Sequence, residues 1–163
     1  MNSIVIYGSR TGNTRKVASA IADVLAHRGD VLLVAAEDAT AIDPQADELL
    51  VVGSPTESHT MTPAVREWLE AMGPNGLSGV TATAFDTRLG MPRWPSGTAA
   101  TAIKRRLVQL GANLVEPEGR FIVAGRPAVL VSGELGRARA WAAELADVAE
   151  PAIAAKAAVG CAS

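Results

Sequence analysis

The chain has 163 residues, of which 48% are hydrophobic and 20% charged, with 15 glycines and 9 prolines. That balance is typical of a globular domain and excludes a disordered or fibrous chain. The formal net charge of −2 provides no basic field for nucleic acid or for an anionic membrane surface. The single cysteine, Cys161, excludes an internal disulfide and a thiolate metal cluster, and it fits a reducing compartment.

The first strand begins almost at Met1, which leaves no room for a signal peptide, and no apolar run is long enough for a membrane span. We therefore expect a cytoplasmic protein that does not bind membranes. The length predicts a single domain over residues 1–163, with a less ordered tail after about residue 150.

Short β-branched runs alternate with amphipathic runs in the first half of the chain. Strands are predicted over Ser3–Tyr7, Val31–Ala35 and Leu49–Val52. Apolar residues at helical spacing predict a helix over Asn13–His27, and a proline at the first helical position predicts another over Pro63–Met72.

The same alternation continues in the second half. Val80–Phe85 predicts a fourth strand, and Gly97–Leu110 predicts a helix with one apolar face. Leu114–Val131 contains two prolines and two glycines, so we interpret it as a fifth strand with an irregular excursion. The last helix is predicted over Gly133–Ala149, with Pro151 ending or kinking it.

Apolar strands that are each followed by a helix predict a parallel sheet covered on both faces. The fold class is therefore α/β, a three-layer doubly wound sandwich around a five-stranded parallel sheet. Ligands of such sheets bind beyond the carboxyl ends of the strands. Three loops leave strands at that edge, over residues 8–14, 53–62 and 86–97.

The first of these loops carries the most informative motif, Ser9-Arg10-Thr11-Gly12-Asn13-Thr14. Three hydroxyl groups and a run of backbone N–H groups lead into a helix N-terminus, which suits a phosphate dianion. Gly12 lets the backbone approach a ligand closely. The alternative is plain N-capping by Thr11 or Asn13, which needs one such residue rather than a row of them.

Other phosphate-binding and phosphorylated loops do not fit this spacing. A Walker loop needs Lys-Ser/Thr after its second glycine, but Gly12 is followed by Asn13-Thr14. The dinucleotide fingerprint needs three glycines, and only Gly8 and Gly12 are present. A phosphorelay receiver needs acidic residues where this chain has Ser9-Arg10 and Gly53-Ser54.

The loop Ser9–Thr14 resembles the FMN-phosphate loop of flavodoxins at all of its positions. The segments Val51–Thr56, Phe85–Leu89 and Glu134–Trp141 are similar to the second flavin loop, the third flavin loop and the last helix of short, stand-alone members. The resemblance implies strand order 2-1-3-4-5, non-covalent FMN and one-electron transfer between proteins. The residues that it implies for FMN binding are Ser9, Arg10, Thr11, Gly12, Asn13, Thr14, Ser54, Pro55, Thr56, Glu57, Ser58, His59, Thr87, Arg88, Leu89 and Trp94.

The chain departs from the flavodoxin pattern in its aromatic residues, which make up only 4% of it. Flavodoxins usually hold the isoalloxazine ring between two aromatic side chains. Here the second loop offers only His59, and the third offers only Trp94. Trp68 and Trp141 lie at helical spacing with core residues, so we expect them to serve packing. We therefore expect a less negative second reduction potential than in a typical flavodoxin.

No constellation for nucleophilic or metal catalysis is present: Ser54 and Ser132 lack a histidine and an acid at plausible positions, and two histidines cannot build a metal site. We therefore expect an FMN electron carrier between a reductase and a redox acceptor, rather than a stand-alone catalyst. One alternative is an FMN-dependent NAD(P)H:quinone-type oxidoreductase. Another is a flavin-free interaction module of the same fold. A monomer or weak dimer is expected, without nucleic acid or metal.

Overall fold

The computed structural model describes residues 1–90 and 97–160 of the chain. Seven strands form one sheet: β1 (Asn2–Tyr7), β2 (Val31–Ala35), β3 (Glu48–Pro55), β4 (Thr81–Leu89), β5 (Asn113–Leu114), β6 (Gly119–Ala124) and β7 (Val129–Leu130). The helices are α1 (Asn13–Leu25), the short 3-10 helix η1 (Ala36–Asp38), α2 (Pro63–Ala71), α3 (Ala99–Gln109) and α4 (Glu134–Gly160).

The sheet is parallel apart from its last strand. Its order is β2-β1-β3-β4-β6-β7, with β5 pairing the amino end of β4 and β7 antiparallel to β6. With β6 as the fifth parallel strand, the predicted order 2-1-3-4-5 is confirmed. The strand order reverses between β1 and β3, so the edge next to their carboxyl ends is where a ligand is expected.

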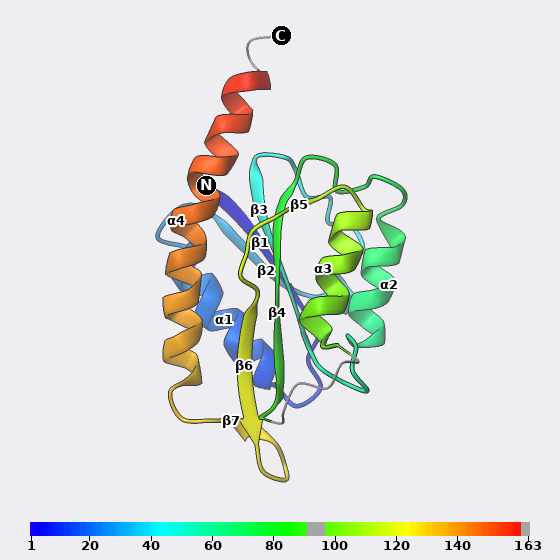
Figure 1. The fold of residues 1–163 in the computed structure, drawn as a ribbon, viewed down its shortest axis with the longest axis vertical. Helices are drawn as coiled ribbons and strands as arrows, with labels where there is room; N and C mark the ends of the chain where they lie inside the picture. The colour runs from blue at the N-terminus through cyan, green and yellow to red at the C-terminus, as the bar shows by residue number, and fades with distance from the viewer. Residues whose placement is uncertain (91–96, 161–163) are drawn as a thin grey trace.

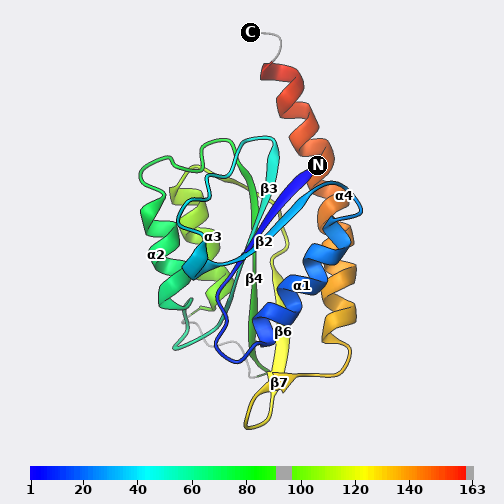
Figure 2. The same cartoon turned by 180° about the vertical axis from the view of Figure 1, so that it is seen from behind.

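Two helices cover each face of the sheet (Figure 1 and, from behind, Figure 2). One apolar core lies between the sheet and α2 and α3, and it includes Trp68 and Ile103. The other lies between the sheet and α1 and α4, and it includes Ile21 and Phe121. These two cores confirm the three-layer sandwich.

The two helical tryptophans differ in burial. Trp68 is 3% exposed and donates its Nε1–H to the Ala39 carbonyl at 3.0 Å, which confirms its packing role. Trp141 packs against Phe85 and Phe121, with ring centroids 6.4 and 6.1 Å away, but it stays half-buried.

The predicted fourth strand ends too early. β4 continues past Phe85 to Leu89, because β6 pairs with it as far as Leu89↔Val123. The four residues after Phe85, which the sequence pattern placed in a loop, are therefore held in the sheet.

The last two predicted elements also differ from the structure. The predicted fifth strand is divided into β5, β6 and β7, with a turn at residues 125–128 between the last two. Helix α4 does not end at Pro151 but continues to Gly160. Ile153, buried against the α1–α4 core, supports the helix beyond the proline.

Candidate functional site at the carboxyl edge of the sheet

The first loop leads into α1 through a glycine in the left-handed conformation. Gly12 has a φ of 83° and occupies the N-cap position, so no side chain caps the helix. The N–H groups of the first helical turn need acceptors from outside the helix. Because α1 has no acidic residue in its first turn, its positive end is not neutralised locally. This arrangement fits an anion.

Two hydroxyl groups lie beside this helix end. Ser9 Oγ accepts a hydrogen bond from the Gly12 N–H at 3.1 Å, and Thr11 Oγ1 accepts one from Asn13 Nδ2 at 3.0 Å. Because each hydroxyl acts as an acceptor here, its own hydrogen remains available to a ligand oxygen. Thr11 is exposed and Ser9 is half-buried, so both hydroxyls lie near the surface.

The last two residues of the loop motif are turned inward. The hydroxyl of Thr14 lies 2.7 Å from that of Thr87 on β4, and both residues are buried. Asn13 Nδ2 donates to the carbonyl of Ala128, in the β6–β7 turn, at 2.8 Å. Their side chains secure the loop to the sheet, and their backbone N–H groups remain at the helix end.

The second loop begins with two residues engaged in internal hydrogen bonds. Ser54 is fully buried, and its Oγ accepts from the Thr62 N–H at 2.9 Å while donating to the Pro55 carbonyl. Thr56 Oγ1 accepts from the Ala99 N–H at 3.0 Å, which joins the second loop to the start of α3. Ser54 and Thr56 therefore shape this edge, and Pro55 ends β3 within it.

Residues 57–60 form a tight turn in which Glu57 and Thr60 exchange two backbone hydrogen bonds of 2.9 Å. Ser58 and His59, at its centre, have φ values of 46° and 67°. Positive φ at both central residues is the geometry of a type I′ turn, which favours Asn-Gly. The Ser-His pair therefore adopts it under strain. Arg10 forms an ion pair with Glu57, with 3.2 Å between Nε and Oε1, and so connects the first and second loops.

The residues expected from the third loop lie at the end of β4. Thr87 is buried against Thr14, Arg88 is half-buried, and Leu89 is 51% exposed. Leu89 thus offers an apolar surface at the edge of the sheet. Trp94, the one aromatic residue expected there, lies outside the described residues.

Asp86 is a residue of this edge that sequence analysis did not select. It is fully buried, and its Oδ2 accepts from the Thr56 hydroxyl and from the Ala100 N–H, both at 3.3 Å. Burial raises the pKa of its carboxyl, against the opposing effects of Thr98, the Ala100 N–H and Arg88. The sequence feature that could have indicated Asp86 is its carboxylate directly after the apolar run Val80–Phe85. Asp86 and Thr87 together join β4 to the first loop, the second loop and the start of α3.

A surface hollow of about 400 Å³ lies next to the turn, between the second loop and α3. Its lining includes His59, Thr60, Thr98 and Arg105. The hollow places one cationic side chain close to the second loop, beside the two central residues of the turn.

The donor groups of the first loop fit a phosphate. The end of α1 provides N–H groups, and Ser9 and Thr11 provide hydroxyls. The loop Ser9–Thr14 contains no acidic side chain that would oppose an anion, and its one cation, Arg10, is paired with Glu57. For a flavin ring, the described part of the edge offers Leu89 and the exposed imidazole of His59. The phosphate end of FMN is therefore the better-fitted part.

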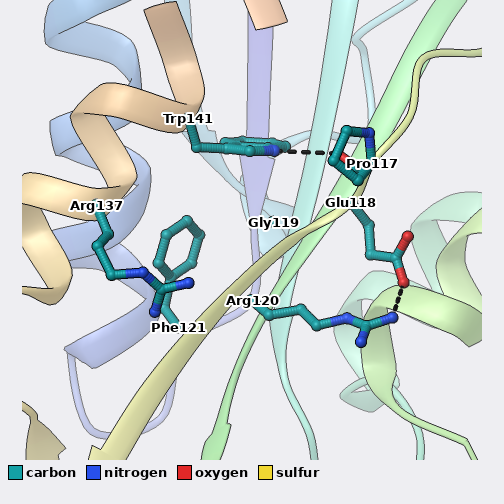
Figure 3. Close-up of a pocket in the computed structure, with 7 residues that line it drawn as sticks. All are labelled: Pro117, Glu118, Gly119, Arg120, Phe121, Arg137 and Trp141. Atoms are coloured by element: carbon teal, nitrogen blue, oxygen red, sulfur yellow. Dashed lines mark hydrogen bonds and ion pairs between the residues drawn. The ribbon is translucent and has the colours of Figure 1, made fainter. Parts of the chain in front are cut away.

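A second hollow, of about 390 Å³, lies away from these loops, between β6 and α4 (Figure 3). Arg137 lies over the Phe121 ring, 6.0 Å from its centroid, and the Trp141 Nε1–H donates to the Pro117 carbonyl. Arg120 is paired with Glu118, and Arg137 with Glu134. Because both guanidinium groups have carboxylate partners, this hollow offers no excess positive charge to an anion.

Comparison with known proteins gives one family match. Residues 5–125 match the profile of the family described as Flavodoxin. No curated protein matches the sequence significantly. Over the described residues, no helix is long and apolar enough to cross a membrane.

Solved structures of the same fold include small proteins and parts of larger ones. A flavodoxin from the domain Archaea has a TM-score of 0.68 and 21% identity, over 90% of this chain and 97% of that one. A flavodoxin, WrbA-like protein from Agrobacterium tumefaciens has a TM-score of 0.71 and 19% identity, over 92% and 98%. The flavodiiron protein from Giardia intestinalis has a TM-score of 0.74 and 20% identity, over 95% of this chain but 37% of that one.

Proposed function

The chain belongs to the flavodoxin family, and from that premise we propose that it binds FMN and carries electrons between a reductase and a redox acceptor. When bound, FMN supplies the redox chemistry, and the protein supplies binding, orientation and electrostatics. The observation that carries the proposal is the uncapped N-terminus of α1 behind Gly12, with the Ser9 and Thr11 hydroxyls beside it.

The chain's own residues have distinct tasks in this proposal. The first-turn N–H groups of α1 and the hydroxyls of Ser9 and Thr11 hold the phosphate, and Arg10 links the first loop to Glu57 of the second. Asn13 and Thr14 keep the loop in place through Ala128 and Thr87. The turn 57–60 and Leu89 border the space for the ring system.

The absorption spectrum of the purified protein, before and after incubation with FMN, tests the proposal directly. We expect flavin bands that remain with the protein through gel filtration. A protein that stays colourless after incubation with FMN contradicts the proposal and favours a flavin-free interaction module.

Substitutions in the first loop test the site itself. Thr11→Val and Ser9→Ala each remove a hydroxyl near the anion, so each should weaken FMN binding roughly ten- to hundredfold. Fluorescence quenching of added FMN measures the dissociation constant. Thr40→Val, at an exposed position outside the three loops, is the matched control. Equal affinities of the loop and control variants argue against this phosphate site.

An FMN-dependent NAD(P)H:quinone-type oxidoreductase is the second candidate, and the hollow beside the turn 57–60 favours it. The second loop offers only the exposed imidazole of His59 to cover a flavin ring, and Arg105 lines the hollow next to it. A cation at this place suits an anionic or carbonyl-bearing small molecule.

Steady-state consumption of NAD(P)H by the FMN-loaded protein with a quinone separates the two candidates. A carrier should show slow turnover that rises only when a reductase is added. Fast turnover without a reductase, lowered by Arg105→Gln but not by Arg28→Gln, identifies the oxidoreductase.

A further inference from the structure

Helix α1 carries its charges in the order that its own dipole disfavours. Arg15 and Lys16 lie in its first turns, where the helix end is positive, while Asp23 lies near its negative end. Helix dipoles favour the reverse arrangement. Local charge that opposes local stability is expected where another role requires it.

A cation from another helix lies beside these two. Arg15 and Lys16 line a hollow of about 460 Å³ together with Gly12 of the first loop and Arg139 of α4. Asp23 lines the same hollow as its single acidic residue. Three exposed cations from two helices therefore border a hollow that reaches Gly12 of the first loop.

A fourth cation comes from the β6–β7 turn. Arg126 is exposed in this turn, and the hydrogen bond from Asn13 Nδ2 to the Ala128 carbonyl holds the turn against the first loop. Figures 1 and 2 show the turn beyond the sheet, at the end where α1 and α4 begin. We call Arg15, Lys16, Arg126 and Arg139 the basic rim.

No carboxylate of residues 1–90 or 97–158 forms an ion pair with a member of the basic rim. The other acidic side chains at this edge are accounted for. Glu57 is paired with Arg10, Glu134 is paired with Arg137, and Asp86 is buried. Glu37 and Asp38 belong to η1, which packs on the face of the sheet covered by α2 and α3, opposite α1 and α4.

The four charges of the rim also exceed what a cofactor phosphate neutralises, because a phosphate monoester carries about two negative charges. The edge thus stays positive on a chain whose formal net charge is −2. We propose that the basic rim docks an acidic surface of the protein with which this chain exchanges electrons. The inference rests on the proposed carrier function and names the chemistry of the partner.

Binding of labelled peptides tests the sign and class of the partner without requiring flavin. In anisotropy titrations, a fluorescein-labelled oligoglutamate should bind both flavin-free and FMN-loaded protein, and an oligolysine should not. Raising the salt from about 20 to about 300 mM should abolish the binding, because the shorter Debye length screens the exposed charges of the basic rim from those of the peptide. Tighter binding of an oligothymidylate of equal charge overturns the assignment to an acidic protein surface.

Variants place the effect on the rim. Arg126→Gln should weaken oligoglutamate binding about two- to fivefold, and Arg15→Gln combined with Lys16→Gln roughly tenfold. Arg28→Gln, which removes one charge from a site paired with Asp147 and Glu150, is the matched control. Equal losses for Arg126→Gln and Arg28→Gln overturn the proposal.

Electron transfer to small oxidants links the rim to the carrier function. Reduced, FMN-loaded protein passes one electron to hexacyanoferrate(III) or to hexaammineruthenium(III). With increasing salt, we expect the rate to fall for the anionic complex and to rise for the cationic one. The opposite pair of slopes overturns the proposal. A protein that binds oligoglutamate but no FMN keeps the basic surface and contradicts only the carrier function.

Discussion

The carboxyl group of Asp86 is buried at the end of β4, and no described residue donates to its Oδ1. Because burial raises the pKa of this carboxyl above its ordinary value of 3.8, the folded protein holds the proton at a higher pH than the unfolded chain does. The ionised group therefore costs stability, and this cost grows as the pH rises from the ordinary value through the raised one.

Replacing Asp86 by Asn should remove that dependence, since an amide keeps the acceptor for Ala100 and Thr56 without the charge. We expect Asp86→Asn to become more stable relative to the unsubstituted protein as the pH rises from about 3 to about 7, so the difference between their free energies of unfolding should increase. Urea unfolding at several pH values measures it. Asp47→Asn removes the same charge from an exposed position. If the free energies of unfolding of Asp86→Asn and of the unsubstituted protein change in parallel with pH, the Asp86 carboxyl is not the origin of the pH dependence.

Glu118 shows the opposite behaviour. Burial opposes its ionisation, but hydrogen bonds from Lys104 and Arg120 outweigh burial and lower its pKa to about 2. Because the folded-state pKa is depressed, its stabilising effect is present above the ordinary value of 4.5 and is lost as the pH falls towards 2.

Glu118→Gln should therefore lower the free energy of unfolding at pH 7 by about 1–2 kcal/mol, and the loss should fade in acid. Glu116 also pairs with Lys104, at 2.5 Å, but its side chain is 53% exposed. Glu116→Gln should cost less than about 0.5 kcal/mol and serves as the control. Denaturant unfolding at neutral and acid pH compares the two, and equal losses contradict the assignment.

At the scale of elements, the type I′ turn of residues 57–60 stores strain because neither central residue is glycine or asparagine. Ser58→Asn combined with His59→Gly supplies the preferred pair and should raise stability by about 1 kcal/mol, or about 2–4 °C in Tm. Thermal melts monitored by circular dichroism measure it. His59→Ala removes the ring but keeps the strain, so its Tm should not rise. An unchanged Tm in the Asn-Gly variant means that the turn is relaxed.

Elements with a local signal could be predicted from the sequence, and elements that depend on distant pairing could not. Val31–Ala35 is an isolated apolar run, and the predicted strand agrees with β2. Asp86 and the two residues after it have no apolar pattern. They are in β4 because β6, more than thirty residues away, pairs with them. The continuation of α4 through Pro151 likewise depends on the burial of Ile153 in another layer.

The candidate site shows the same division. The three loops follow from strand ends and composition, but the direction of each side chain depends on its neighbours in space. Thr14 points inward because its hydroxyl bonds with that of Thr87, and Ser54 because its Oγ accepts from the Thr62 N–H, whereas Thr11 remains at the surface. Polar residues in a loop motif look alike in sequence, and only the tertiary partners separate anchors from ligand-facing groups.

At the scale of the whole molecule, scarce aromatic residues leave alanine-rich helices to cover the sheet. Small residues such as Ala18, Ala22, Ala138 and Ala142 fill the layer of α1 and α4, where they are buried. The described rings of Phe85, Phe121 and Trp141 cluster beneath α4. Three of the six aromatic side chains are thus used for packing on this face, and Trp68 packs on the other. Few are left for a flavin ring, and the less negative second potential stays a prediction.

Helix α4 is longer than the sheet that it covers. Its 27 residues span about 40 Å, whereas the nine residues of β4 span about 30 Å. Figure 1 shows its last turns beyond the amino edge of the sheet. Two residues hold this extension against the fold: Ile153 is 6% exposed, and Lys156 Nζ donates to the Gly79 carbonyl at 3.0 Å and to Thr81 Oγ1 at 2.8 Å.

Truncation should therefore have a threshold between Glu150 and Lys156. Ending the chain after Lys156 removes the exposed Ala157 and Ala158 but no described tertiary contact, so Tm should change by less than about 1 °C. Ending it after Glu150 also removes Ile153 and Lys156 and should cost about 2–4 kcal/mol. Ile153→Ala in the full chain measures the contribution of the apolar burial alone, because the hydrogen bonds of Lys156 remain. Urea unfolding of the three proteins decides the matter: equal stabilities show that α4 stabilises the fold only through the turns before Pro151.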